Sequence, residues 1–375
     1  MMTTKRLLDV CDFQGGTQPP KDEWINDPRE GYVRMLQIRD YSQGDAKFIQ
    51  YVKDTKKLHK CKKDDIMLSR YGYIGQAFIG LEGAYNVALV KVIKKAEIHT
   101  PYLLCYFQSY YFQHFLLSNV GARATIPGFN KDELENALIR IPEMCKQIEI
   151  ASKITKVDEL IGFHKQQLNV LDTLIKSRFI EMFGTLSSNE QNFKVLTIES
   201  LCSLIKDGTH QTPTYTEDTI NGFKFLSSKD VMSKKIDWSD IKYIPSDLHE
   251  KLYAVVKPIK NDILMSKNGV NYGVAAVNDT DEVFDIYVSL ALLRPKIDII
   301  NPVYFRSAIN SPDTKRQFDS SIKGIGVPNL HLGEIKKTKI LVPPVDKQNE
   351  YVSFVEQVDK SKYHGEFTCE MEVAA

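Results

Sequence analysis

Cysteine, net charge and long apolar runs are all scarce in this sequence. Its six cysteines and its net charge of +1 are spread over 375 residues, and no two cysteines form a CxxC pair. This pattern argues against a zinc site and against a disulfide framework. No apolar run reaches the length of a membrane span, and the start, MMTTKRLLDVCDF, lacks the apolar segment of a signal peptide. We therefore expect a cytoplasmic protein without a membrane partner.

Catalytic signatures are also scarce. The chain has no GxxxxGK[ST] phosphate loop, no HExxH and no GxSxG, and its eight histidines show no metal-ligand spacing. Asn301-Pro302-Val303-Tyr304 resembles the NPPY tetrapeptide of amino-methyltransferases, and Pro312-Asp313-Thr314-Lys315 resembles half of a nuclease motif. A helix start explains both stretches better, because proline is favoured in a first helical turn. We expect no catalytic residue and no metal ligand.

A long helix is predicted in the middle of the chain, over residues 146–183. Pro142 precedes it and Gly184 follows it, as is typical of helix ends. Two sets of residues spaced by seven alternate at the offset of a coiled-coil seam. They are Ile154, Ile161, Leu168, Ile175 and Met182, and Val157, His164, Leu171 and Arg178. The alternative is an amphipathic core helix, but a second helix of this kind exists later in the chain.

The sequence contains an internal duplication. Adding 201 to a residue number maps the first half onto the second, so that Leu89 falls on Leu290 and Pro142 on Pro343. Seven of the seventeen positions in 142–158 are identical to their counterparts in 343–359. Chance would give roughly one match, so the repeat is real. At smaller offsets, Gly16-Thr17 corresponds to Gly208-Thr209, and DIMLSR (65–70) corresponds to DILMSK (262–267).

The duplication divides the chain into four segments, 1–142, 143–184, 185–342 and 343–375. Each lobe is predicted to be mixed α/β. Strands are expected at 33–38, 66–69, 73–79 and 86–92, and again at 223–226, 263–266, 274–277 and 287–293. Thr100 as a cap and Pro101 as the first helical residue predict a helix to about Ser118, and Pro302 begins its counterpart. The second long helix is expected from about Lys347 and is predicted to fade after Lys362.

Polar and basic residues lie beside glycine in corresponding loops of the two lobes. Arg, Asn, Gln, Ser, Thr and His are the residues that read base edges or hold phosphates, and glycine lets a backbone come close. Ordinary turn chemistry is the competing interpretation for any one of them. The candidate DNA-binding residues are Thr17, Gln18, Arg39, Ser69, Arg70 and Tyr71 in the first lobe, and Thr209, His210, Lys229, Ser266, Lys267 and Asn268 in the second. The lysine-rich run at 53–63 is a further phosphate candidate.

These features together resemble the DNA-specificity subunit of type I restriction-modification systems over essentially the whole chain. The residues that carry the resemblance are LLDVCDFQGGTQPP at the start, DIMLSRYG and DILMSKNG in the two lobes, IPGFNKDELENALIRIP and VPNLHLGEIKKTKILVPP at the lobe ends, and KQIE and KQNE at the starts of the helices. The resemblance implies two target-recognition domains held apart by an antiparallel pair of helices that form a coiled coil. The pairing residues would be Ile154, Val157, Ile161, Leu168, Leu171, Ile175, Val355 and Val358.

The resemblance also implies partners. Each domain would read one half of a bipartite double-stranded DNA site, and the helices would serve as spacer and docking rail for two methyltransferase subunits. Restriction motor-nuclease subunits would join that complex. S-adenosylmethionine, ATP and Mg would belong to those partners, so this chain would hold no cofactor and catalyse no reaction.

The second helix departs from this pattern, because it is expected to stop some twenty residues short of the first. A truncated specificity subunit, or a duplicated protein-interaction scaffold that no longer reads DNA, is therefore the alternative function. A self-contained methyltransferase is a third possibility that would need a cofactor loop, which the sequence does not show.

Overall fold

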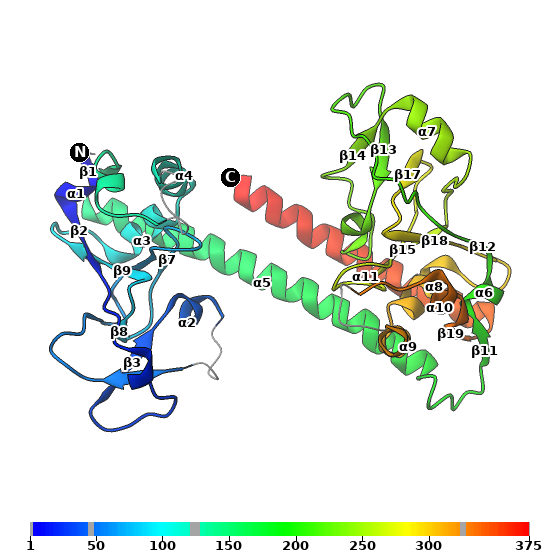
Figure 1. Cartoon of the computed structure of the whole chain (residues 1–375), viewed down its shortest axis with the longest axis horizontal. Coiled ribbons are helices and arrows are strands. Elements are labelled where there is room, and N and C mark those ends of the chain that lie inside the picture. The colour runs from blue at the N-terminus through cyan, green and yellow to red at the C-terminus, as the bar shows by residue number, and fades with distance from the viewer. Residues whose placement is uncertain (1–2, 44–48, 121–127, 323–327, 375) are drawn as a thin grey trace. The chain divides into compact units, whose positions relative to one another are not determined.

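The computed structural model describes residues 3–43, 49–120, 128–322 and 328–374, with side chains as far as Lys362. The loops at 121–128 and 324–329, which lie between matched anchors of the repeat, are therefore described only at their ends. The chain separates into two compact units, unit 1 (Met1–Ile161) and unit 2 (Gly162–Ala375). The boundary falls inside the longest helix, α5 (Met144–Phe183, Figure 1).

The described residues of unit 1 form ten short strands and several small helices. The strands are β1 (Thr3–Arg6), β2 (Cys11–Gly15), β3 (Tyr32–Leu36), β4 (Tyr51–Lys53), β5 (Lys60–Cys61), β6 (Met67–Ser69), β7 (Ala77–Phe78), β8 (Gly83–Tyr85), β9 (Leu89–Lys94) and β10 (Leu138–Ile141). The helices before α5 are α1 (Leu7–Val10), α2 (Ile38–Ser42), α3 (Thr100–Gln108) and α4 (Tyr110–Asn119), with 3-10 turns at Lys21–Glu23 and Asp132–Leu134.

Unit 2 repeats this order. Its strands are β11 (Lys194–Thr197), β12 (Cys202–Asp207), β13 (Phe223–Leu226), β14 (Lys242–Ile244), β15 (Ile263–Ser266), β16 (Ala275–Val277), β17 (Phe284–Ile286), β18 (Leu290–Pro295) and β19 (Lys339–Val342). Its helices are α6 (Ile198–Leu201), α7 (Ser246–Tyr253), α8 (Pro302–Ile309), α9 (Pro312–Ser321), α10 (Leu332–Lys337) and α11 (Val345–Ala374), with a 3-10 turn, η4, at Ser228–Val231.

The larger sheets of the two units have the same strand order, and the smaller sheets share three strands. The strand order β2-β9-β6-β7 in unit 1 corresponds to β12-β18-β15-β16 in unit 2, and β4-β3-β8-β5 corresponds to β14-β13-β17. The first strand of each unit pairs antiparallel with the last, as β1 with β10 and β11 with β19. The predicted mixed α/β class is therefore confirmed, together with the duplication.

A buried glutamine marks the start of each long helix. The side chain of Gln147 donates to the Pro142 carbonyl oxygen at 2.8 Å and accepts from the His99 amide at 3.0 Å. Gln348 donates to the Pro343 carbonyl oxygen at 2.8 Å and accepts from the Asn301 amide at 2.8 Å. Both side chains are buried. These bonds join the start of α5 to α3 and the start of α11 to α8.

Within unit 2, α5 and α11 lie against each other in antiparallel orientation. Asp172 accepts from Lys362 at 2.6 Å, whereas Glu350 accepts from Arg178 at 3.4 Å, so rising numbers on one helix meet falling numbers on the other. Ile175 packs against the core of unit 2, and Val355 and Val358 are buried. The predicted antiparallel contact is thus present along this part of α5.

The other predicted pairing residues are not part of the core of unit 2. Ile154, Val157 and Ile161 belong to unit 1, where the Ile154 side chain is 39 % exposed. Leu168 and Leu171 are half-buried. Their pairing stays a prediction.

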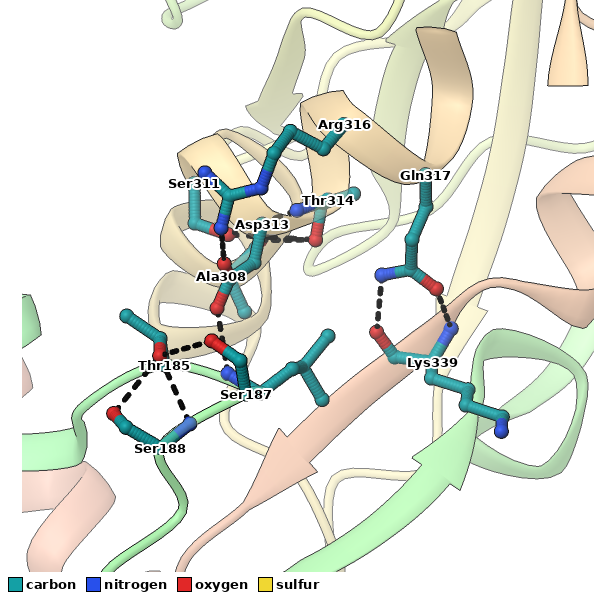
Figure 2. Close-up of polar contacts among 11 residues, drawn as sticks. Thr185, Ser187, Ser188, Ala308, Ser311, Asp313, Thr314, Arg316, Gln317 and Lys339 are labelled. Atoms are coloured by element: carbon teal, nitrogen blue, oxygen red, sulfur yellow. Dashed lines mark hydrogen bonds and ion pairs between the residues drawn. The ribbon is translucent and has the colours of Figure 1, made fainter. Parts of the chain in front are cut away.

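The loop that follows α5 is fastened to α9 (Figure 2). The Leu186 amide donates to the Asp313 carboxylate at 2.7 Å, and Thr185 hydrogen-bonds to the side chain of Ser188 at 2.9 Å. The side chain of Gln317 in α9 donates to the Lys339 carbonyl oxygen at 3.0 Å and accepts from the Lys339 amide at 2.8 Å, which joins α9 to β19. Within unit 2, α9 therefore bonds both to the loop that follows α5 and to β19.

Several local predictions were wrong. Ser109 interrupts the helix expected from Thr100 to about Ser118, since its hydroxyl accepts from the Phe112 amide and starts α4. His99, not Thr100, is the N-cap of α3. The expected strand 73–79 shrinks to β7, because Gly72 and Gly75 adopt left-handed backbone conformations.

The second long helix does not end near Lys362. The backbone of α11 is helical to Ala374 and spans 30 residues, against 40 in α5. The stretch after Lys362 contains one glycine and no proline, so nothing in it forces a helix to stop. The difference in length from α5 is smaller than the sequence suggested.

Candidate nucleic-acid interface

Both units contain a Gly-Thr turn directly after the first strand of the larger sheet. In unit 1 the Gly16 amide donates to the Leu89 carbonyl oxygen at 3.1 Å, and the Thr17 amide donates to the Tyr85 carbonyl oxygen at 3.0 Å. A Cβ on Gly16 would lie 2.0 Å from the Asn86 carbonyl oxygen. Only glycine lets the backbone come this close.

The turn in unit 2 has the same construction. Gly208 donates to the Leu290 carbonyl oxygen at 3.4 Å and Thr209 to the Ile286 carbonyl oxygen at 3.0 Å. A Cβ on Gly208 would lie 2.1 Å from that Ile286 oxygen. The sequence match Gly16-Thr17 to Gly208-Thr209 therefore reflects a shared backbone contact.

A second pair of turns is organised by serine. In unit 1 the Ser69 hydroxyl accepts from the Gln76 amide at 2.9 Å and donates to the Tyr73 carbonyl oxygen. In unit 2 the Ser266 hydroxyl accepts from the Val274 amide at 3.0 Å and donates to the Asn271 carbonyl oxygen at 2.9 Å. We call these segments, 69–76 and 266–274, the serine turns.

A third pair of turns follows β3 and β13, and each is a reciprocal capping box. Asp40 accepts from the Gln37 amide at 2.8 Å at the start of α2. Asp230 accepts from the Ser227 amide at 2.7 Å at the start of η4. These capping turns carry Arg39 and Lys229 at equivalent positions.

All three turns of a unit converge on one short connector between two strands. In unit 2 this connector is residues 286–290, which bond to the Gly-Thr turn. The Ser289 hydroxyl accepts from the Ser228 amide of the capping turn at 2.9 Å, and the Ser289 carbonyl oxygen accepts from the backbone amide of Lys267 in the serine turn at 2.9 Å. In unit 1, residues 85–89 also bond to the Gly-Thr turn, and the Ala88 carbonyl oxygen accepts from the Arg70 amide at 2.7 Å. Ala88 has no hydroxyl, so here the connector instead reaches the residue just before the capping turn, where the Asn86 amide donates to the Leu36 carbonyl oxygen at 3.0 Å. The connector fixes the three turns relative to one another, which produces one composite surface per unit.

The unit 1 surface presents planar polar groups. Arg39 donates to the Gln50 side chain at 2.7 Å, and Gln50 also accepts from Gln37 at 3.2 Å and donates to Asn26 at 3.4 Å. Such amide and guanidinium groups match the donor and acceptor patterns of base edges. Sequence reasoning found Arg39 but missed Gln37, Gln50 and Asn26, whose proximity depends on the pairing of β3 with β4.

Arg70 and Tyr71 extend this surface. The Arg70 guanidinium lies over the Tyr71 ring at 5.4 Å and donates to the Phe129 carbonyl oxygen at 3.1 Å. Tyr73, which the sequence analysis did not single out, projects from the tip of the serine turn with 78 % of its surface exposed. Gln18 is exposed and Thr17 half-buried in the adjacent Gly-Thr turn.

The unit 2 surface is more strongly charged. Lys229 lies 2.8 Å from Asp230 and 3.1 Å from Asp240. Burial lowers the pKa of Lys229, but the hydrogen bonds that its ammonium group donates to the two carboxylates, with their negative charge, outweigh burial and raise the pKa above its usual value. His210 is exposed, with its Nε2 atom 3.7 Å from Asp207. Lys229 is therefore charged at physiological pH, and phosphate would have to compete with these carboxylates for it.

Three predicted contact residues are structural instead. Ser69 and Ser266 have no exposed surface, because their hydroxyls lie inside the serine turns. Lys267 is 4 % exposed and bonds Asp207 at 2.7 Å. None of these side chains can reach a ligand in this conformation. Thr209 and Asn268 are half-buried, and Asn268 forms a backbone bridge with Asn329.

The motifs that resembled catalytic sites are helix starts, as predicted. Asn301 caps α8 by accepting from the Val303 amide at 2.9 Å. Ser311 caps α9, and Asp313 holds Leu186 and Arg316. Within the described parts of the chain, no group of three or more His, Cys, Asp or Glu residues is placed to hold a metal ion. No helix among the described residues is long and apolar enough to cross a membrane.

Comparison with known proteins covers nearly the whole chain. The family model for the type I restriction modification DNA specificity domain matches residues 1–173 and again 190–365. The specificity subunit of the type I restriction enzyme MjaVIII from Methanocaldococcus jannaschii is 24 % identical over 368 residues, which is 94 % of this chain and 85 % of that protein. The EcoBI specificity subunit from Escherichia coli is 22 % identical over 376 residues, covering 90 % of this chain and 75 % of its own.

Solved structures agree on the fold. The S subunit of the type I restriction-modification system from M. genitalium superposes with a TM-score of 0.55 at 13 % identity, covering all of this chain and 93 % of that one. A chain from a study of complex assembly and conformational transition in a type I system gives a TM-score of 0.58 at 15 % identity, with coverage of 100 % and 94 %.

Proposed function

The chain belongs to the type I restriction-modification DNA specificity family, and from this premise we propose that each unit reads one half of a bipartite double-stranded DNA site. The observation that carries the proposal is the duplicated composite surface, in which three turns are fixed on one connector. DNA readers place a few side chains at base edges and rely on phosphate contacts for register. Rigid turns rich in Gln, Asn, Arg and Lys meet both needs.

The two surfaces should read different bases. Unit 1 offers Arg39 with Gln37 and Gln50, whereas unit 2 offers Lys229 and His210. Arginine and glutamine can each make paired hydrogen bonds to guanine and adenine, respectively, and lysine also favours guanine. Because α5 belongs to both units, its length should set the number of unread base pairs between the half-sites, measured against the B-DNA repeat of about 34 Å.

The chain itself makes and breaks no covalent bond in this proposal. Two methyltransferase subunits dock along the helices, and motor-nuclease subunits join them in the cytoplasm. S-adenosylmethionine, ATP and Mg are bound by those subunits and not by this chain. The apolar side chains that α5 exposes in each unit, such as Ile148 and Phe163, support a docking role for this helix.

Selection of DNA from a random pool by the chain with its methyltransferase subunit tests the proposal. We expect an enriched motif of two short half-sites with a fixed gap, and binding that weakens steeply as salt rises. If the complex forms but enriches no split motif, DNA reading is refuted and the scaffold alternative is favoured. S-adenosylmethionine binding by the isolated chain would instead support the methyltransferase alternative.

A further inference from the structure

Unit 2 contains a pocket with an excess of positive charge. Its walls come from α5, α8, α11, the start of α9 and the loop that follows η4, all of which belong to unit 2 at this place. Five of the lining residues are basic and only two are acidic. The basic residues are Lys176, Lys234, Lys235, Arg306 and Lys362. We call this site the basic pocket.

The two acidic residues of the pocket are already engaged. Asp172 accepts from Lys362 at 2.6 Å, and Asp359 lies 3.4 Å from Lys362 and 3.8 Å from Lys235. The other three basic residues form no side-chain hydrogen bond and no ion pair with the part of the chain that the structure describes. These three are Lys176, Lys234 and Arg306. Cations that share a pocket without carboxylates of their own are suited to bind an anion.

Lys234 is held in this pocket at a cost to the protein. Its backbone is left-handed, with a φ of 64°, which a residue with a Cβ atom disfavours, and its amide donates to the Val231 carbonyl oxygen at 3.0 Å. Burial lowers the pKa of Lys234, and the neighbouring cations, chiefly Lys176, lower it further, with Asp172 opposing them. A bound anion would stabilise the charged form of this side chain.

Two further features of the pocket favour an anion. The Tyr351 side chain has no exposed surface, and its hydroxyl has no hydrogen-bond partner among the described residues. Burial raises the pKa of Tyr351, and the nearby Ser307 hydroxyl opposes this only in part, so the Tyr351 hydroxyl keeps its proton and can donate it to an acceptor. The start of α9, at Ser311 and Pro312, lines the same pocket, and a helix N-terminus carries partial positive charge.

The internal repeat shows that the scaffold does not need these polar groups. Subtracting 201 maps Arg306 onto Cys105 and Tyr351 onto Ile150. Unit 1 nevertheless forms α3 where unit 2 forms α8, and begins α5 where unit 2 begins α11. Since the fold forms without a cation and a hydroxyl at these positions, their presence in unit 2 favours a role in binding.

The size of the pocket limits what it can enclose. Its volume is about 90 Å³, well below the roughly 300 to 1,000 Å³ of pockets that enclose a drug-sized ligand. A phosphate group is small, carries negative charge and accepts several charge-assisted hydrogen bonds from arginine and lysine.

We infer that the basic pocket binds a phosphate group, with Lys176, Lys234, Arg306 and the Tyr351 hydroxyl as its donors. The group belongs either to a small free anion or to the backbone of DNA, which offer the same chemistry to this site. The inference does not depend on the proposed reading of DNA bases, because a free anion can be tested without DNA.

Chemical acetylation of lysines in the full chain, read by mass spectrometry, tests the inference. The probe is inorganic phosphate at constant ionic strength, which separates site binding from general screening. We expect phosphate to slow the labelling of Lys176 and Lys234 in a saturable manner and to leave Lys260 unaffected, since Lys260 is exposed outside the pocket. A second arm uses random-sequence duplex DNA in phosphate-free buffer. Protection by free phosphate assigns the site to a small anion, and protection by DNA alone assigns it to a DNA backbone.

Two variants separate binding from folding. Arg306→Gln removes a guanidinium group that bonds to no described residue, and Lys234→Gly removes an ammonium group while relieving the left-handed backbone. Each should keep or raise the thermal stability and weaken the protection of Lys176 about tenfold. Asn261→Gly is the matched control, because Asn261 also has a positive φ, of 72°, and lies outside the pocket.

Two results would overturn the inference. One is the absence of protection at both lysines by phosphate up to about 10 mM and by DNA. The other is protection of Lys176 that persists at full strength in both variants, since the phosphate group would then occupy another site.

Discussion

The two units keep one scaffold and differ in how each serine turn uses its basic residue. In unit 2, Lys267 is buried against Asp207, whereas in unit 1 the equivalent Arg70 lies over Tyr71. The exchange traces to the end of the first strand of the larger sheet, because unit 1 has Gly15 where unit 2 has Asp207. Because unit 1 lacks a carboxylate at this position, its own basic residue, Arg70, is left at the surface.

A second difference lies beside the smaller sheet. Unit 1 closes this sheet with β5, whereas unit 2 has α7, whose His249 bonds Asp285 at 2.7 Å and stacks on Phe223 at 3.6 Å. Burial raises the pKa of Asp285, and the bond from His249 partly opposes this. The backbone contacts of the turns are shared between the units, while the segments around them are not. The two copies have thus kept the backbone contacts that hold the turns, and they differ in the segments that surround those turns.

The largest loss of stability is expected from changes in the Gly-Thr turns, whose backbone contacts are the same in both units. Gly208→Ala and Gly16→Ala each place a methyl group about 2 Å from a carbonyl oxygen, so the backbone must move. We expect each to destabilise its own unit by roughly 3 kcal/mol. Hydrogen exchange should show lost protection in the sheet of the altered unit only. Gly333→Ala, where the added methyl meets nothing within 4 Å, is the control. Equal protection in all three variants would refute the shared contact.

Replacing the basic residue of each serine turn should show how much that residue stabilises its unit, with a larger effect for the buried Lys267 than for the surface Arg70. Lys267→Ala leaves Asp207 without its buried partner and should cost unit 2 about 2 to 3 kcal/mol. Arg70→Ala should cost unit 1 about 1 kcal/mol, because its hydrogen bonds are partly exposed. Denaturant titration followed by exchange in each unit measures both. A double variant, Lys267→Met with Asp207→Ala, should recover most of the loss, and a failure to recover would show that the pair is not the cause.

The buried glutamines test whether the long helices are anchored alike. Gln147→Leu and Gln348→Leu each remove hydrogen bonds from buried backbone groups, and we expect a loss of about 1 to 2 kcal/mol in both units. Thermal unfolding monitored by exchange in 99–108 and 300–309 measures the effect. If one variant has no effect on stability, the buried glutamine does not anchor that helix, and the two long helices are not anchored alike.

The smallest effect concerns Gly162, where the two units meet within α5. Nothing lies within 4 Å of a Cβ added there, and the residue is helical. Gly162→Ala should therefore raise stability by about 0.5 to 1 kcal/mol through helix propensity. Differential scanning calorimetry would detect the change. A decrease in stability would mean that α5 needs a flexible point at this position.

The sequence predicted the duplication and the long central helix because both rest on strong local signals. Seven-residue spacing and identical residues at one offset do not depend on tertiary contacts. The strands 223–226 and 263–266 were placed correctly, since each is a short apolar run bounded by turn residues. Helix ends were less accurate, as with Ser109, whose capping bond is not visible from residue type alone.

The candidate site was predicted only in part, because a side chain's direction depends on partners far away in the chain. Ser69 and Ser266 are polar residues beside glycine, but their hydroxyls serve their own turns. Lys267 is basic, yet Asp207 is 60 residues earlier and only the strand pairing brings them together. Gln50 meets Arg39 for the same reason. The exposed Tyr73 had no distinguishing spacing in the sequence.

Genome-wide mapping of methyladenine tests the central account, that each unit reads its own half-site through its own turns. Cells would express the chain with its methyltransferase subunit, as the parent sequence or as Arg39→Ala or Lys229→Ala. The account predicts a split motif with a fixed gap for the parent chain, relaxed only in one half by Arg39→Ala and only in the other half by Lys229→Ala. A motif that loses both halves together with either variant, or no motif although both proteins are soluble, would contradict it.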